Sequence, residues 1–344
     1  MLAAIQSGVH EVDVRDVPAP ARSDAALIRV RAVGICGSDV NTYHDRIEAQ
    51  SVPDGHEVAG EVVQLPADYE GPIGEGDLVA VDTICLGLAC ETCEFCRAGQ
   101  PFHCTQRHRM PAWGGGFAEL IQRYPAGLFK LPASMTAEQG ALVEPLAVGV
   151  HALRLAHMSV GSTVVIVGAG TIGLMTLVAA KAAGAGSVHV VARHAQQVEL
   201  AKLIGADTVL PAAWEDSISL TQELTGGAGA DLVIDAVGRG ADAFQLAYQL
   251  VRPQGTVALL GAFPGPVTVD LFPLLLKEVR TIGSACYSII DGRHDFEIAI
   301  DILAAGHTRA SEMVTHRFPL HEAAAAFRTA ADKSSGSVKV QIIP

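Results

Sequence analysis

The sequence Ser162-Thr163-Val164-Val165-Ile166-Val167 runs directly into Gly168-Ala169-Gly170-Thr171-Ile172-Gly173. The first six residues are mostly β-branched, which is typical of a strand buried on both faces of a sheet. The apolar run 174–183 that follows predicts a helix. A G-x-G-x-x-G pattern between a strand and a helix indicates a dinucleotide site at Gly168, Gly170, Thr171, Ile172 and Gly173, because glycines let a pyrophosphate approach the helix N-terminus. The alternative is a strand–turn–helix unit that binds no ligand.

Strand-like and helix-like stretches alternate after this motif. Further strands are expected at 187–191, 231–235 and 255–260, and helices at 196–203 and 241–251. Such alternation predicts a doubly wound parallel sheet, so the chain is assigned to the α/β class.

The region before the motif has a different pattern. Residues 1–80 contain short alternating runs broken by glycine and proline, with strands expected at 27–33, 61–65 and 77–81. This pattern predicts a β-rich first domain. A helix at 295–305 and a last strand at 338–343 are expected near the end of the chain, and the last strand fits best in the first domain.

The segment Gly55-His56-Glu57-Val58-Ala59-Gly60 places an imidazole beside a carboxylate between glycines. Cys36 lies upstream in another glycine-flanked segment, and Glu144 lies in an apolar run far downstream. Brought together by folding, these residues would supply the sulfur, nitrogen and oxygen ligands of a catalytic zinc site with one open position. For each residue alone, the alternative is a structural role in the core.

Five of the seven cysteines fall between Cys85 and Cys104. Cys90, Cys93, Cys96 and Cys104 are spaced by three, three and eight residues, which suits four thiolates around a structural zinc ion. The alternatives are an iron–sulfur cluster, for which the chain offers no electron partner, and two disulfides, which a reducing cytosol disfavours. Cys85 lies outside the spacing and is expected to be a small core residue.

The composition limits the classes of partner. The chain has 344 residues, enough for two domains, and its 24 Lys and Arg against 37 Asp and Glu give a formal net charge of −13. This charge argues against nucleic acid or an anionic membrane surface as partner. The N-terminus has no signal-peptide pattern, and the uncharged run 161–180 contains glycines and changes from a strand to a helix pattern, so no membrane span is expected. A cytoplasmic location is the expectation.

With these motifs the chain resembles the zinc-dependent medium-chain dehydrogenases/reductases of the alcohol dehydrogenase superfamily, and most of all their sorbitol (polyol) dehydrogenase branch. The resemblance spans essentially the whole chain and is carried by 34–39, 55–57, the four-cysteine lobe, 144–149, 168–173 and 314–320. It implies a GroES-like β-rich catalytic domain formed by 1–148 and 288–344, with a structural-zinc lobe at 85–105. It also implies a Rossmann domain at 149–287.

The activity that the resemblance implies is hydride transfer between a secondary alcohol and NAD(P). The substrate would be a polyol, a sugar or a cyclitol-like compound that is interconverted with its ketone. A threonine-dehydrogenase-like enzyme for an amino alcohol, or for a simple alcohol or aldehyde, is the alternative. Zinc-free reductases of the superfamily lack the zinc ligands and the cysteine lobe, and a non-catalytic zinc protein would have no use for Ser38 beside an intact ligand set.

Residue by residue, the resemblance matches Cys36 and His56 to the catalytic zinc ligands. Glu57 and Glu144 both match carboxylates near the metal, and either one is a candidate for the direct ligand. Ser38 matches the hydroxyl that relays the substrate proton. Asp39 matches a partner that orients the ligand imidazole. The four spaced cysteines match the structural site, so two zinc ions per chain are expected.

The chain departs from the polyol dehydrogenases on the substrate side. Asn41 stands where many relatives have a histidine of the proton relay, so His44 or water is expected to replace it. Cys286 stands where polyol enzymes have an arginine that contacts sugar hydroxyls. The loop between Cys36 and His56 is also shorter than in those enzymes. The identity of the alcohol is therefore left open.

Cofactor choice is predicted from Ala192, Arg193 and His194, which follow the expected strand 187–191. NAD-using relatives have an Asp or Glu at the position of Ala192 to bind the ribose hydroxyls, whereas no carboxylate occurs here before Glu199. A guanidinium at Arg193 suits an anionic 2′-phosphate. NADP is therefore favoured, and the alternative is NAD with Arg193 as a solvated surface charge.

Residues 265–270 are expected to form a short strand near an edge of the Rossmann sheet. Exposed edges are usually paired or covered, and the relatives pair this region across a two-fold axis. A homodimer or a homotetramer is therefore expected. The alternative is a monomer in which prolines protect this strand.

Overall fold

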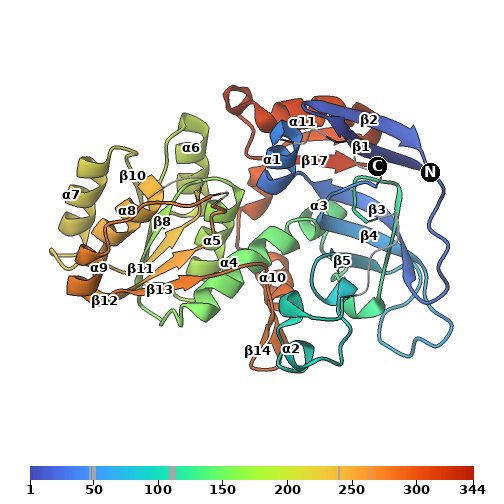
Figure 1. The fold of residues 1–344 in the computed structure, drawn as a ribbon, viewed down its shortest axis with the longest axis horizontal. Helices are drawn as coiled ribbons and strands as arrows, with labels where there is room; N and C mark the ends of the chain where they lie inside the picture. The colour runs from blue at the N-terminus through green and yellow to red at the C-terminus, as the bar shows by residue number, and fades with distance from the viewer. Residues whose placement is uncertain (46–47, 49–51, 108–113, 239–240, 264) are drawn as a thin grey trace. The chain divides into compact units, whose positions relative to one another are not determined.

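The computed structural model describes residues 1–45, 48, 52–107, 114–238, 241–263 and 265–344. The chain forms two units, each of which is described by itself (Figure 1). The first unit comprises Met1–Glu144, Tyr287–Gly306 and Ser311–Pro344, and the second comprises Pro145–Cys286 and His307–Ala310.

The first unit is built on a mixed β-sheet. Its strands follow the order β16-β17-β3-β4-β5-β7, β6 also pairs with β3, and β1 and β2 form a separate hairpin. The strands are β1 (Leu2–Gly8), β2 (Glu11–Asp16), β3 (Ala26–Gly34), β4 (Glu57–Gln64), β5 (Leu78–Asp82), β6 (Leu120–Arg123), β7 (Leu128–Lys130), β14 (Ile289–Ile290), β15 (Arg293–His294), β16 (Val314–Pro319) and β17 (Lys339–Ile343). The helices and helical turns are α1 (Gly37–Asp45), η1 (Leu86–Leu88), α2 (Glu94–Arg97), η2 (Pro101–His103), η3 (Pro125–Gly127), α3 (Ala137–Gly140), α10 (Asp295–Ala304), η4 (Ala310–Met313), η5 (Leu320–Glu322), α11 (Ala323–Ala331) and η6 (Lys333–Ser335).

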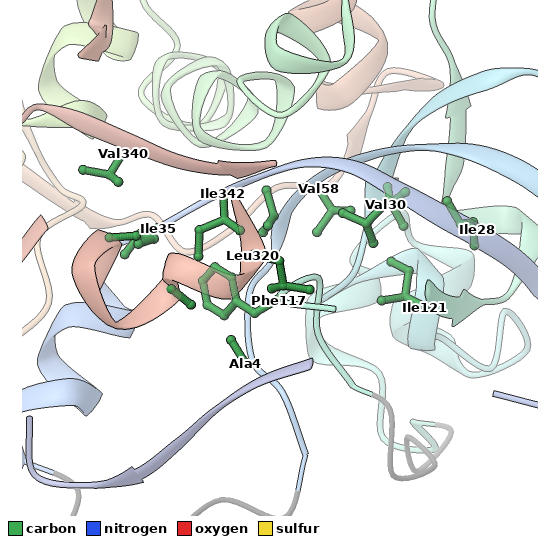
Figure 2. Packing of buried hydrophobic residues seen from close by; sticks show 14 of the residues in the cluster. Ala4, Ile28, Val30, Ile35, Val58, Phe117, Ile121, Leu320, Val340 and Ile342 are labelled. Atoms are coloured by element: carbon green, nitrogen blue, oxygen red, sulfur yellow. The ribbon is translucent and has the colours of Figure 1, made fainter. Parts of the chain in front are cut away.

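Strand β3 shows why these segments form a sheet. Ile28 and Val30 are buried, whereas the intervening Arg29 and Arg31 are exposed, which is the period-two pattern of a strand with one face on a core. Figure 2 shows this core, where Ile342 of β17 lies in the same cluster as the residues of β3. Strand β17 pairs with β3, so the prediction that the last strand returns to the first domain is confirmed.

The second unit is a parallel sheet with the strand order β10-β9-β8-β11-β12-β13. The order reverses between β8 and β11, the kind of position at which open α/β sheets bind ligands. The predicted doubly wound sheet is therefore confirmed. Its elements are β8 (Thr163–Val167), α5 (Thr171–Ala182), β9 (Ser187–Val191), α6 (Ala195–Ile204), β10 (Thr208–Leu210), α7 (Trp214–Leu224), β11 (Ala230–Asp235), α8 (Ala241–Leu250), β12 (Val251–Leu259), α9 (Phe272–Lys277) and β13 (Arg280–Gly283), and α4 (Val143–Leu155) leads into this unit.

The uncharged run 161–180 forms β8 and most of α5, as predicted. Within the described ranges, no helix combines the length and the apolar character needed to cross a bilayer.

The strand predicted at 265–270 is wrong. These residues are not in a strand, and the edge of the sheet is β13, which pairs with β12. Pro266 has no N–H to give to a strand ladder, which disfavours a strand at this place. Helices α1, α4 and α7 were not predicted, because polar residues or glycine and proline interrupt their apolar period.

Asp82, at the end of β5, fixes the point where the chain re-enters the first unit. Its fully buried carboxylate accepts hydrogen bonds from the backbone N–H groups of Ile84 at 3.0 Å and of Cys85 and Leu86 at 2.7 Å. The hydroxyl of Tyr287 donates to the same carboxylate at 3.1 Å. The loop before the cysteine lobe and the returning segment therefore depend on one side chain.

We expect Asp82→Ala to lower the free energy of unfolding of the first unit by about 3–5 kcal/mol, because each hydrogen bond to a charged group contributes about 1.5–3 kcal/mol and buried donors would lose their acceptor. Tyr287→Phe removes the hydroxyl that donates to Asp82 and should cost about 1.5–3 kcal/mol. Thermal unfolding followed by calorimetry measures both changes. Asp68→Ala, at an exposed position, is the control and should keep the melting temperature of the wild type. If Asp82→Ala also keeps that melting temperature, the prediction is wrong.

Candidate active site

A cysteine, a histidine and a carboxylate converge at one end of the paired strands β3 and β4. Cys36 lies between β3 and α1, and His56 precedes Glu57, the first residue of β4. The strands pair with Gly34 opposite Glu57. One ligand atom from each of Cys36, His56 and Glu57 lies within 4.8 Å of the other two. The predicted sulfur, nitrogen and oxygen donors thus form one group that could hold zinc.

Asp39 lies beside the His56 ring. Its Oδ2 accepts a hydrogen bond from the N–H of Cys36 at 2.8 Å, and its Oδ1 lies 4.0 Å from Nδ1 of His56. Burial raises the pKa of Asp39 to about 6, while His56 acts in the opposite direction. Burial also opposes the charging of His56, yet Cys36 and Asp39 raise the pKa of the ring well above its usual value. Asp39 is therefore placed to orient the imidazole.

Lys339, the first residue of β17, was not predicted as part of the site. Its Nζ donates to both carboxylate oxygens of Glu57 at 2.6 Å and to the carbonyl oxygen of Ile35 at 2.9 Å. Both side chains of the pair are 1% exposed. Burial disfavours the charge of Lys339, but Glu57 and Cys36 raise its pKa. A β-carbon at Gly34 would lie 1.9 Å from Oε2 of Glu57, so this arrangement requires glycine there.

Glu144 lies in the first turn of α4 and is buried. It is not among the three residues whose ligand atoms gather within 4.8 Å. Its charge nevertheless helps to raise the pKa of both His56 and Lys339, so it lies near them. The structure thus brings Glu57 into the ligand group and leaves Glu144 beside it.

Ser38, in the first turn of α1, lines a cavity of about 350 Å³. His56, Asp54, Thr83 and Arg123 line the same cavity. A hydroxyl and an imidazole therefore face a hollow of the size that small-molecule ligands occupy. Asp54 and Arg123 were not predicted from the sequence, where the clue to Arg123 was a charge at the end of the short strand β6.

Asn41 and His44, the two positions considered for a longer proton relay, do not line this cavity. Oδ1 of Asn41 is buried and has no hydrogen-bond partner within the described parts of the chain. Nδ1 of His44 lies 2.8 Å from Nε2 of His10, at the turn between β1 and β2. His44 does not line the cavity, which argues against it as a replacement for the relay histidine.

The sulfur atoms of Cys90, Cys93, Cys96 and Cys104 all lie within 4.8 Å of one another. The Cys93–Cys96 and Cys90–Cys104 sulfur distances are 3.5 Å, close to the roughly 3.8 Å expected between thiolates bound at about 2.3 Å to a tetrahedral zinc. Hydrogen bonds from the backbone of Cys96 and Thr105 lower the pKa of Cys93 to about 6, whereas burial raises the pKa of the neighbouring Cys96 to about 12. All seven cysteines lie in the described part of the chain and none forms a disulfide, and Cys85 is buried outside the group.

The glycine-rich turn of the second unit follows β8. Gly168 has a φ of 103°, which favours glycine. A β-carbon at Gly173 would lie 1.8 Å from the carbonyl oxygen of Gly168, whereas nothing lies within 4 Å of one at Gly170. Helix α5 begins at Thr171, followed by Ile172, and Gly170 is its N-cap residue. No side chain among the described residues makes a capping hydrogen bond at this N-terminus. A tight turn and an open helix N-terminus fit a pyrophosphate.

Ala192, Arg193 and His194 follow β9, the next strand of the sheet. Ala192 is buried and its N–H donates to the carbonyl oxygen of Leu210 at 3.2 Å, whereas Arg193 is exposed. His194 is the N-cap of α6. The end of this strand therefore offers a guanidinium and no carboxylate.

Comparison with known proteins decides the family. A model described as "Alcohol dehydrogenase GroES-like domain" matches residues 22–133, and one described as "Zinc-binding dehydrogenase" matches residues 171–305. Sorbitol dehydrogenase of Gallus gallus is 33% identical over 98% of this chain and 94% of its own length. The chain belongs to the zinc-binding alcohol dehydrogenase family. L-threonine 3-dehydrogenase of Pyrococcus horikoshii is a further relative, 36% identical over 90% of this chain and 88% of its own length.

Solved structures of zinc-binding dehydrogenases share the fold. Galactitol-1-phosphate dehydrogenase from Escherichia coli has a TM-score of 0.88 and 28% identity, with 100% of both chains covered. A zinc-binding dehydrogenase from Sinorhizobium meliloti 1021 bound to NADP has a TM-score of 0.85 and 29% identity, with 100% of this chain and 99% of its own covered. The predicted GroES-like and Rossmann folds are confirmed, and the protein is an oxidoreductase of this zinc- and NAD(P)-binding family.

Proposed function

We propose that this dehydrogenase interconverts a secondary alcohol and its ketone, with a polyol, sugar or cyclitol-like compound as the alcohol. The observation that carries the proposal is the group of Cys36, His56 and Glu57 beside the Ser38 hydroxyl. The sorbitol and galactitol-1-phosphate dehydrogenases among the similar proteins support a polyol. An amino alcohol, as used by a threonine-dehydrogenase-like enzyme, is the less supported alternative.

The proposed ligands of the catalytic zinc are Cys36, His56 and Glu57, with Glu144 as a nearby carboxylate able to exchange with Glu57. The three donors fit zinc because they are close together and combine a thiolate, an imidazole and a carboxylate. Zinc held there would supply Lewis-acid chemistry to the alcohol oxygen. Ser38 accepts the hydroxyl proton at Oγ while its own proton passes to a water molecule in the cavity, and Asp39 keeps the His56 ring in its orientation.

A second, structural zinc ion is proposed at Cys90, Cys93, Cys96 and Cys104, whose free thiols suit the cytoplasm.

We propose that the catalytic domain consists of 1–148 and 288–344 and the Rossmann domain of 149–287. NAD(P) would bind the second domain through Gly168, Gly170 and the turn that follows, with Arg193 and His194 near a 2′-phosphate. NADP is thus the favoured cofactor, and NAD remains the alternative.

A homodimer or homotetramer is proposed to form through the α9 surface. This surface consists of Leu271, Phe272, Leu275 and Leu276, which are between 64% and 71% exposed. Strand β13, at the edge of the sheet, follows α9 directly. Contiguous exposed apolar side chains and an open strand edge are both features that a partner subunit covers.

Elemental analysis of protein purified without chelator should approach two zinc ions per chain. Cys93→Ser should lose one ion and much of the thermal stability, because a missing ligand opens a closed site. Cys36→Ser should lose the other ion and the activity while keeping the melting temperature near that of the wild type. Cys85→Ala is the control and should retain both ions. A zinc content near zero in the wild type would refute both sites, and full turnover of Cys36→Ser would refute the catalytic one.

Cofactor preference should show in steady-state kinetics with both nucleotides. A charge-assisted contact contributes about 1.5–3 kcal/mol, so we expect NADP to be favoured by about 10- to 100-fold in kcat/KM. Ala192→Asp combined with Arg193→Ala should reverse the preference, because a carboxylate would repel the 2′-phosphate. If the wild type works equally well or better with NAD, the role given to Ala192 and Arg193 is wrong, while the dehydrogenase function is unaffected.

Light scattering at micromolar concentration should give the mass of a dimer or a tetramer. Leu275→Glu places a charge in the α9 surface and should shift the mass towards the monomer, because a buried unpaired charge is costly. Val160→Glu is the matched control, since Val160 is 84% exposed outside this surface. A monomeric wild type would rule out the assembly.

A further inference from the structure

Arg123 brings a buried positive charge to the cavity that Ser38 lines. It ends β6 and is 3% exposed. Its Nη1 donates to the carbonyl oxygen of Gln122 at 2.7 Å, and its Nη2 donates to the carbonyl oxygen of Gly114. Its Nε is buried and has no hydrogen-bond partner within the described residues. The guanidinium therefore has neutral acceptors only, and part of its donor capacity is unused.

The acidic group that acts on this charge, Asp82, is already engaged. Its carboxylate accepts three backbone N–H groups and the hydroxyl of Tyr287. Burial lowers the pKa of Arg123 to about 10, with Asp82 and Tyr287 acting in the opposite direction, so the guanidinium is still charged at neutral pH. Buried charges in proteins are normally paired, because an isolated one is costly. Arg123 thus lacks a counter-ion of its own among the described residues.

The side chain is held at the cavity rather than free to turn away. A β-carbon at Gly87 would lie 3.0 Å from Cδ of Arg123, so glycine leaves the room that the stem of Arg123 occupies. Among the described residues that line the cavity, Arg123 is the one arginine or lysine. Asp54 and Thr83 line the same cavity and offer oxygens to hydroxyl groups.

We propose that Arg123 binds an anionic group, a phosphate or a carboxylate, carried by a polyhydroxylated substrate. The proposal rests on the dehydrogenase function given above and narrows its substrate class to polyol phosphates or sugar acids. A guanidinium binds either group through charge-assisted N–H···O bonds, and the described residues leave Nε of Arg123 without an acceptor. The anion then supplies the missing counter-ion, and Asp54 accepts hydrogen bonds from the hydroxyls.

The test compares kcat/KM for D-glucitol, D-glucitol 6-phosphate and D-gluconate in the zinc-loaded enzyme. We expect the wild type to favour an anionic probe by about 10- to 100-fold, and the better of the two anions identifies phosphate or carboxylate. Arg123→Met should bring the ratio of kcat/KM between the anionic probe and D-glucitol down to about one, and Arg123→Lys should keep part of the preference. Arg31→Met, which removes a surface arginine paired with Glu61, is the control and should not change the ratio.

Two results overturn the proposal and leave the dehydrogenase function standing: a wild type that uses D-glucitol at least as well as both anions, and an equal loss on neutral and anionic probes in Arg123→Met. If no probe is oxidised, the proposed polyol function fails. Calorimetric titration of the enzyme with D-glucitol 6-phosphate and with D-gluconate then tests separately whether Arg123 binds an anion. Binding that Arg123→Met abolishes supports it, and no binding overturns it. If Arg123→Met does not fold, the wild-type preference and Arg123→Lys decide in the same way.

Discussion

The buried ion pair between Lys339 and Glu57 is the constraint on which the candidate metal site depends. Two charges removed from water are costly unless their remaining donors and acceptors are satisfied. Here the ammonium donates to both oxygens of Glu57 at 2.6 Å and to the carbonyl oxygen of Ile35 at 2.9 Å. Removal of either partner would leave an unpaired buried charge. The last strand of the chain and the loop before Cys36 must therefore be in place together.

The features that could be predicted from the sequence are those made by neighbouring residues. The turn between Gly168 and Gly173 and the spacing of the four lobe cysteines follow from short-range geometry. The alternation around Ile28 likewise identifies a strand and its buried face. The doubly wound sheet follows because each strand of the second unit except the last, β13, leads into a helix, and right-handed crossovers leave few topologies. The candidate ligands Cys36, His56 and Glu57 were also named from their motifs, and the structure brings them together.

The features that could not be predicted depend on residues far apart in the sequence. Lys339 lies 282 residues from Glu57, and a lysine in an apolar strand usually signals an exposed edge. The edge strand was wrongly predicted at 265–270, because local alternation of apolar and polar residues does not show which strand lies at the edge of the sheet. The motifs could not decide whether Glu57 or Glu144 is the direct metal ligand. The two carboxylates differ in their distance from Cys36 and His56, which only the folded structure shows. The cavity that contains Arg123 draws on five separate stretches of the first unit.

The Lys339–Glu57 pair also sets the charge that the ligand group presents. A thiolate and a carboxylate together would cancel the charge of a divalent ion, which would weaken its pull on an alcohol oxygen. Lys339 offsets the negative charge of Glu57, so the Cys36–His56–Glu57 group is less anionic than its residue types suggest. Arg123 adds a second positive charge at the cavity that Ser38 and His56 line. A chain with a net charge of −13 thus places two buried cations among the buried carboxylates of this unit, which include Asp39 and Glu144. The local balance of these charges, rather than the overall charge, sets the field inside the site.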